Sequence, residues 1–95
     1  MPRYSALTDR SAVFRALEEF DRIGRDAFLH KYGFGPARLY LLTTESGSYD
    51  SKAIFGAAYG YQHGTPLTSG EFSGGRAGAA GRLAELGFEI TGISR

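Results

Sequence analysis

The residues best placed for chemistry lie where a short turn leads into a helix, at Tyr49-Asp50-Ser51-Lys52-Ala53. Free backbone amides at a helix start, together with the helix dipole, bind anions. Lys52 falls in the first turn, where a cation is unfavourable for the helix itself. Either a phosphate rests beside Lys52, or this is an ordinary capped helix whose lysine lies in solvent or pairs with Asp50. The residues alone favour neither interpretation.

A second run of the same kind is Ser73-Gly74-Gly75-Arg76, which reads as the start of the last helix. Glycine inside a helix costs about 1 kcal/mol relative to alanine, so close packing or a close ligand must offset it. We interpret Gly75 and Arg76 as phosphate contacts. Gly78 and Gly81 are better explained by tight packing.

Tyrosines and one arginine extend this candidate surface. Tyr49 at a hairpin end and Tyr59, which is off the buried helix stripe, are expected to be accessible. An exposed tyrosine can stack on a base or line a pocket for a methyl group. Tyr61 lies on the stripe and is expected in the core. Arg38 precedes the first strand and reaches either DNA or solvent.

The sequence gives little support for a catalytic site or a metal site. The chain has no cysteine, two histidines and ten scattered acids, so neither a metal site nor a cofactor is expected. No nucleophile elbow, Walker loop or zinc-protease motif is present. An acid–base pair of His63 with Asp50 is less favoured than a solvated histidine at a helix end.

Composition also narrows the setting. No stretch approaches the roughly 18 apolar residues of a membrane span, and Met1 to Arg10 contains no apolar signal region. A bacterial, cytoplasmic protein is therefore expected. The formal net charge is only +1, so any nucleic-acid contact requires the basic groups to gather on one face.

The elements that position these residues follow from apolar spacing and from capping residues. Thr8 or Asp9 caps a first helix, in which Glu18 and Glu19 belong to the polar face, and Gly24 interrupts it. A shorter helix then ends at Gly33. The remaining elements are a strand over 38–45, a turn at 46–48, a return strand at 48–49, a helix over 50–63, a loop over 67–72, a helix from 73–75 to Gly87, and a strand over 88–93.

This order predicts an α+β domain, with four to five short helices around a small two- to three-stranded antiparallel sheet. Strands this few and short cannot form a sheet that is stable alone, so the helices must cover it. The expected organisation is one DNA-reading domain over residues 1–95, with residues 1–6 as a flexible lead-in.

Several short motifs occur together in a recognisable order. They are Phe20-Asp21-Arg22-Ile23-Gly24-Arg25-Asp26-Ala27-Phe28-Leu29, Tyr32-Gly33-Phe34-Gly35, Tyr49-Asp50-Ser51-Lys52-Ala53-Ile54, Phe72-Ser73-Gly74-Gly75 and Leu86-Gly87-Phe88-Glu89-Ile90. In this set the chain resembles the N-terminal head domain of McrA-like HNH restriction endonucleases. The resemblance runs from Leu7 to Ile90.

The resemblance implies a reader of modified double-stranded DNA from a modification-dependent, type IV restriction endonuclease. Such enzymes cut with a C-terminal HNH domain. No HNH signature occurs here, so the resemblance implies a binding domain without catalytic residues.

Related DNA sulfur-binding domains have a similar helix start, Tyr-Pro-x-Lys-Ala, in which tyrosine, proline and alanine help to form an apolar pocket for a phosphorothioate sulfur. The matching positions here are Tyr49, Asp50 and Ala53. An Asp50 carboxylate in place of the proline would repel an anionic phosphorothioate. A methylated or hydroxymethylated base is therefore the preferred ligand and phosphorothioate DNA the alternative, with Asp50 accepting a hydrogen bond from a base amino group.

The DNA-binding residues expected on these grounds come from both helix starts and from their flanks. They are Arg38, Tyr49, Asp50, Ser51, Lys52, Ala53, Tyr59, Ser73, Gly74, Gly75 and Arg76. The competing hypothesis is a structural or dimerisation module of the nuclease, possible as a homodimer, that does not contact DNA. A large exposed apolar patch, with Lys52 and Arg76 on different faces, would favour that alternative.

Overall fold

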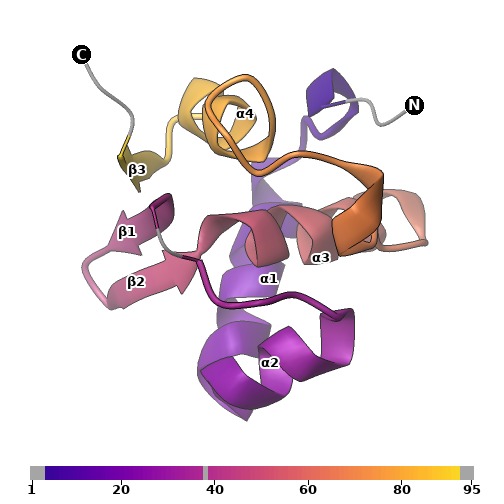
Figure 1. Ribbon diagram of the computed structural model, residues 1–95, viewed down its shortest axis with the longest axis vertical. Coiled ribbons are helices and arrows are strands. Elements are labelled where there is room, and N and C mark those ends of the chain that lie inside the picture. Colours follow the sequence, from indigo (N-terminus) through magenta and orange to yellow (C-terminus); the bar gives the residue numbers. More distant parts are fainter. Residues whose placement is uncertain (1–3, 38, 93–95) are drawn as a thin grey trace.

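A central helix with three further helices around it forms most of the molecule, and a small sheet lies at one side (Figure 1). The computed structural model describes residues 4–37 and 39–92. In chain order the elements are η1 (Tyr4–Ala6), α1 (Arg10–Ile23), α2 (Arg25–Tyr32), β1 (Leu41–Thr44), β2 (Gly47–Asp50), α3 (Ser51–His63), η2 (Ser69–Glu71), α4 (Ala79–Glu85) and β3 (Glu89–Thr91).

The first two helices begin and end at the residues that their capping signals indicate. The Asp9 side chain accepts a hydrogen bond from the Ser11 amide at 2.9 Å, which fixes the start of α1. Gly24 separates the two helices with φ = 92°, and Gly33 ends α2 in the left-handed conformation. Both predictions are confirmed.

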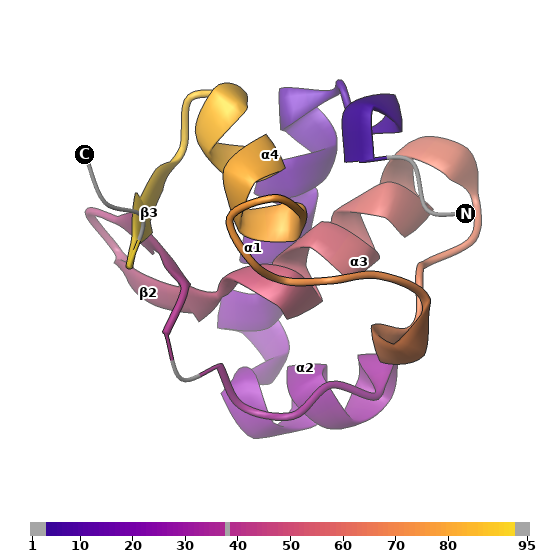
Figure 2. The same cartoon turned by 45° about the horizontal axis from the view of Figure 1, so that its top comes forward.

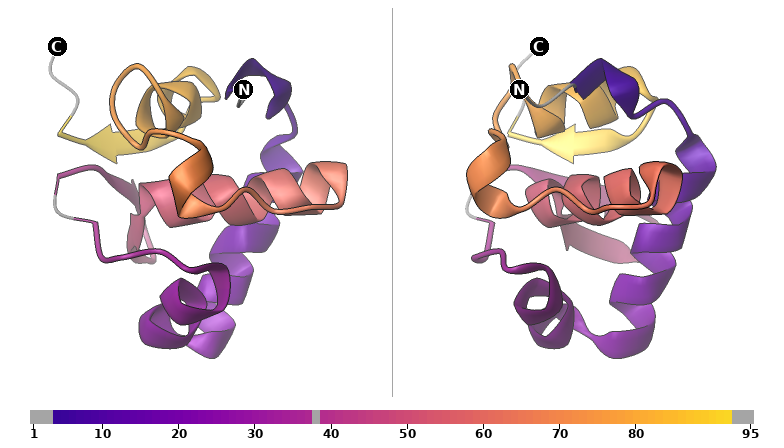
Figure 3. Two further views of the ribbon diagram at one scale, coloured as in Figure 1. Left: turned by 45° about the vertical axis from the view of Figure 1, so that its right-hand side comes forward. Right: turned by 90° about the vertical axis from the view of Figure 1, so that its right-hand side faces the viewer.

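Helix α3 passes through the middle of the molecule, with α2 on one side of it and α4 on the other (Figures 2 and 3). Residues 53–58 of this helix are all buried, so it is apolar around nearly its whole circumference. Phe55 is fully buried beside Phe72, with ring centroids 5.4 Å apart. The core is therefore organised around α3, and the helix start of interest is fixed by what surrounds it.

The sheet is antiparallel, with strand order β2-β1-β3. Leu42 at its centre pairs with Tyr49 on one side and with Ile90 on the other. The α+β class with a three-stranded antiparallel sheet is thus confirmed. Strand β1 begins only at Leu41, and the carbonyl of the preceding Tyr40 accepts a hydrogen bond from the Ser51 hydroxyl. Arg38 and Ile93, expected at strand ends, lie outside the described residues.

The last helix starts later than predicted, at Ala79 instead of Ser73–Gly75. The Ala79 amide donates to the Ser73 carbonyl at 2.9 Å and closes the intervening residues into a loop. Added Cβ atoms at Gly78 and Gly81 would lie 2.3 Å from the Ser73 oxygen and 1.9 Å from the Arg76 oxygen. The interpretation of these two glycines as packing residues is confirmed, and the prediction that a helix starts at Ser73–Gly75 is wrong.

The segment before α1 is packed over residues 4–6, although a flexible lead-in was expected there. The Tyr4 ring contacts Phe55 and Phe72, with centroid distances of 5.8 and 6.4 Å. Its hydroxyl accepts a hydrogen bond from the Ser73 amide at 2.7 Å. Tyr4 therefore connects the start of the described chain to the loop before α4.

A buried carboxylate joins the first three helices. Glu19, expected on the polar face of α1, is only 2% exposed. Its side chain accepts hydrogen bonds from Lys31, from the Tyr32 hydroxyl at 2.6 Å and from the Tyr61 hydroxyl at 2.9 Å. Tyr61, expected in the core, is 38% exposed, although its hydroxyl donates to the buried Glu19 carboxylate. Both burial predictions were wrong.

Candidate functional site

Tyr49 does not reach the surface at the hairpin end, where it was expected to be accessible. Its side chain is 3% exposed, and its ring meets Phe20 edge to face at 4.9 Å. The hydroxyl donates to the Asp21 carboxylate at 2.9 Å. Burial and this hydrogen bond both raise the pKa of the Tyr49 hydroxyl. Tyr49 therefore joins β2 to α1 and leaves little surface for stacking on a base.

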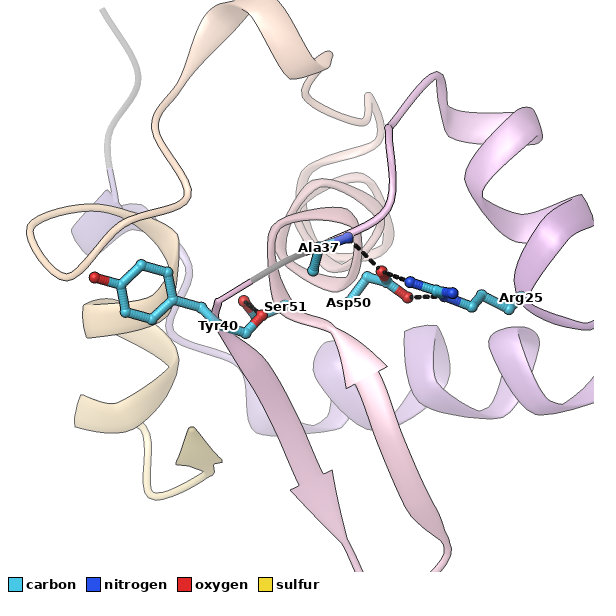
Figure 4. Close-up of polar contacts among 5 residues, drawn as sticks. All are labelled: Arg25, Ala37, Tyr40, Asp50 and Ser51. Carbon is cyan, nitrogen blue, oxygen red and sulfur yellow. Dashed lines mark hydrogen bonds and ion pairs between the residues drawn. The ribbon is translucent and has the colours of Figure 1, made fainter. Parts of the chain in front are cut away.

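The Asp50 side chain is turned toward Arg25 and Ala37 (Figure 4). Its carboxylate is 2% exposed and takes both Nε and Nη2 of Arg25 at 2.8 Å. It also accepts the Ala37 amide at 2.7 Å. Burial raises the pKa of Asp50, but the hydrogen bonds from Arg25 and Ala37 outweigh it and hold the pKa below its ordinary value. The carboxylate is thus ionised, paired and directed away from any ligand at the helix start.

Ser51 and Asp50 together fix the loop that precedes β1. The Ser51 hydroxyl donates to the Tyr40 carbonyl at 2.8 Å, while Asp50 holds the amide of Ala37 (Figure 4). Two consecutive residues therefore hold the loop by hydrogen bonds at Ala37 and at Tyr40, three residues apart. Ala53, the third position of the sulfur-binding pattern, is 1% exposed within the core.

Lys52 has a protein partner that the sequence did not suggest. Its ammonium group donates to the Ser69 carbonyl at 2.8 Å and lies 5.2 Å from the Phe72 ring centroid. An added Cβ on Gly74 would lie 3.0 Å from three carbons of the lysine stem, so this glycine allows the close approach. An ammonium carries three donors, and the bond to Ser69 leaves others for a ligand.

A surface pocket of about 240 Å³ opens at the start of α3. It brings together three of the predicted residues, Ser51, Lys52 and Gly74, from two distant parts of the sequence. The remaining lining residues were not predicted, and they come from the loop that precedes β1: Ala37, Leu39 and Tyr40. Leu39 is 60% exposed. The one signal in the sequence that could have pointed to Leu39 was its position beside Arg38, just before β1.

The other predicted residues lie apart from this pocket. Arg76 lines a different cavity, of about 640 Å³, with Arg82 and Glu85. The Ser73 hydroxyl accepts the Gly75 amide at 3.2 Å, so that amide is occupied by the loop itself. Tyr59 is half-buried, and its ring packs against His63 at a tilt, with centroids 4.5 Å apart. Arg38 lies outside the described residues.

The acid–base alternative fails on geometry. Asp50 precedes the 13-residue helix α3 and His63 ends it, so the two are separated by about 20 Å at 1.5 Å per residue. A ring nitrogen of His63 is instead 2.9 Å from the Ala6 carbonyl. Across residues 4–37 and 39–92, no three histidine, aspartate or glutamate side chains gather into a metal-binding group. No helix in that part of the chain is long and apolar enough to cross a membrane.

Comparisons with protein families and with solved structures point to the same kind of protein. Residues 5–92 match the family described as ScoMcrA-like, N-terminal head domain. The chain is also similar to the type IV phosphorothioation-dependent restriction endonuclease ScoMcrA, whose structure it matches with 32% identity and a TM-score of 0.65. The match covers 93% of this chain and 13% of that enzyme. No curated protein matches the chain significantly.

Proposed function

Because the chain belongs to the ScoMcrA-like N-terminal head domain family, we propose that it is a DNA-contacting module of a type IV restriction endonuclease, without nuclease activity of its own. The observation that supports this most is the pocket at the start of α3, which unites Ser51, Lys52 and Gly74. An exposed leucine and a lysine beside a helix start suit a backbone phosphate and an apolar modification together.

The burial of Asp50 bears on which modification the pocket takes. Asp50 is not available to accept a hydrogen bond from a base amino group, because its carboxylate is already bonded to Arg25 and Ala37. The same contacts remove the repulsion that argued against phosphorothioate. The similar enzyme ScoMcrA is described as phosphorothioation-dependent. We therefore propose phosphorothioate DNA as the first ligand, and a methylated or hydroxymethylated base as the second, since the exposed Leu39 side chain also suits a methyl group.

Lys52→Ala is expected to weaken binding to every duplex about tenfold, because it removes a phosphate contact and not a sequence-reading one. The slope of log affinity against log salt should fall by about 1. Fluorescence polarisation on one duplex, across a salt series, measures both. Arg15→Ala, an exposed arginine of α1 outside the pocket, is the matched control. An unchanged salt slope for Lys52→Ala would contradict a contact between Lys52 and a DNA phosphate.

Leu39→Ser is expected to abolish a preference for modified DNA while leaving binding to the plain duplex within about twofold. Losing the apolar contact of one exposed side chain corresponds to about tenfold in affinity for the modified duplex. The panel should contain unmodified, phosphorothioate, 5-methylcytosine, 5-hydroxymethylcytosine and 6-methyladenine duplexes of one sequence. The duplex whose advantage disappears in Leu39→Ser identifies the ligand. If the wild-type chain binds none of the five at low salt, the proposed function is wrong.

A further inference from the structure

A second hollow surface runs along α1, between this helix and the sheet. Two adjoining pockets, of about 390 and 730 Å³, share Phe14 and Thr44. Helix α1 contributes residues at one-turn intervals, from Arg10 through Phe14 and Glu18 to Asp21. We call these two pockets together the α1 trough. Its length along the helix is about 16 Å, or three turns.

The floor of the α1 trough is apolar and aromatic. Phe14 is 50% exposed, which is unusual for a ring of this size, and it meets Phe88 at a centroid distance of 5.4 Å. The Arg10 guanidinium lies 4.6 Å from the Phe88 ring centroid and donates to the Leu86 carbonyl. The Arg10 guanidinium also lies 5.6 Å from the Phe14 ring centroid, so Arg10 is held within the domain while half of Phe14 stays exposed as the anchor. Aromatic side chains that become buried when two proteins associate dominate the energy of protein interfaces.

The rim of the α1 trough is acidic. Four carboxylates line it, and the only cations among the lining residues are Arg10 and Arg15. The acids are Glu18, Asp21, Glu45 and Glu89. An acidic rim repels the phosphates of DNA and also repels the same face of a second copy of the chain. Charge complementarity instead selects a basic partner.

We propose that the α1 trough binds a basic amphipathic helix of a protein partner. Apolar residues of that helix pack on Phe14, and its lysines or arginines face the acidic rim. The trough is lined by α1, the hairpin and the turn before β3, whereas the pocket at the start of α3 is lined by Ala37, Leu39, Tyr40, Ser51, Lys52 and Gly74. The two sets share no residue, so the domain can hold DNA and a protein segment at separate sites.

The test uses a fluorescein-labelled 15-residue helical peptide of leucine and lysine, with leucines at i, i+3, i+4 and i+7 spacing. The matched control peptide has glutamate in place of every lysine. Fluorescence polarisation with the full 95-residue chain is expected to give at least about tenfold tighter binding of the basic peptide. Phe14→Ser and Glu18→Lys should each weaken that binding about tenfold.

Leu39→Ser, at the other pocket, should leave peptide affinity unchanged. Circular dichroism identifies any variant that fails to fold, and Glu18→Lys alters an exposed side chain, so it tests the proposal even if Phe14→Ser unfolds. Equal affinity for the two peptides, or full affinity in Glu18→Lys, would overturn the proposal. So would a Phe14-dependent dimer of the chain in sedimentation experiments. None of these results depends on DNA binding.

Discussion

Asp50→Ala is expected to lower the free energy of unfolding by about 3 kcal/mol, the lower end of the range for breaking a buried ion pair. The substitution leaves the Ala37 amide without its acceptor and separates Arg25 from the helix start. Because the Arg25 side chain is 48% exposed, water rehydrates its charge and keeps the loss from being larger. Urea unfolding followed by circular dichroism measures the change.

The pH dependence distinguishes this cause from a simple packing defect. The pKa of Asp50 is lowered in the folded protein, so the stabilisation is present above the unfolded value of about 3.9 and is lost as pH falls through the folded value. In Asp50→Asn the stability should fall less steeply than in the wild type as pH falls below about 4. An Asp50→Ala variant as stable as the wild type at pH 7 would refute the structural role.

Glu19→Ala is expected to lower the free energy of unfolding by about 3 kcal/mol as well. The carboxylate accepts three hydrogen bonds that join α1 to α2 and α3, and alanine leaves the Tyr32 and Tyr61 hydroxyls without their acceptor. It also opens a cavity among the three helices. Thermal and urea unfolding should show the loss at pH 7, where the lowered pKa of Glu19 keeps the carboxylate ionised.

Tyr61→Phe provides the matched control for this hydrogen-bond network. It removes one donor from a side chain that is 38% exposed, so the expected loss is about 1 kcal/mol. Glu19→Gln should fall between the two, because its amide oxygen still accepts from both tyrosines while the bond from Lys31 is lost. Equal effects of Tyr61→Phe and Glu19→Ala would contradict the account.

Local signals predicted most of the fold. Asp9, Gly24 and Gly33 act within their own helix ends, and each one marks the boundary that it indicates. The run at Ser73 failed because its serine and glycines close a loop through the bond from the Ala79 amide to the Ser73 carbonyl. The same residue types serve as helix caps and as loop formers, and the choice between them depends on contacts outside the run.

The site was predicted in part, and the misses share one cause. Lys52, Ser51 and Gly74 were found from the helix start and the glycine run, and they meet in one pocket. The burial of Asp50 was missed because its partner, Arg25, is 25 residues earlier in the chain. Glu19 was misassigned to solvent because its donors come from two other helices. Helical spacing says which side chains share a face, but not whether a polar residue on that face finds a partner.

The strand order β2-β1-β3 has a consequence for synthesis on the ribosome. Strand β1 pairs with β2 across a two-residue turn, and this local hairpin can close early. The other edge of β1 pairs Thr43 with Glu89, 46 positions later in the chain, so this edge stays open until β3 has been made. An open edge is a template for wrong pairing. At four residues β1 is short, which limits the exposure of the nascent chain to aggregation while it waits for β3.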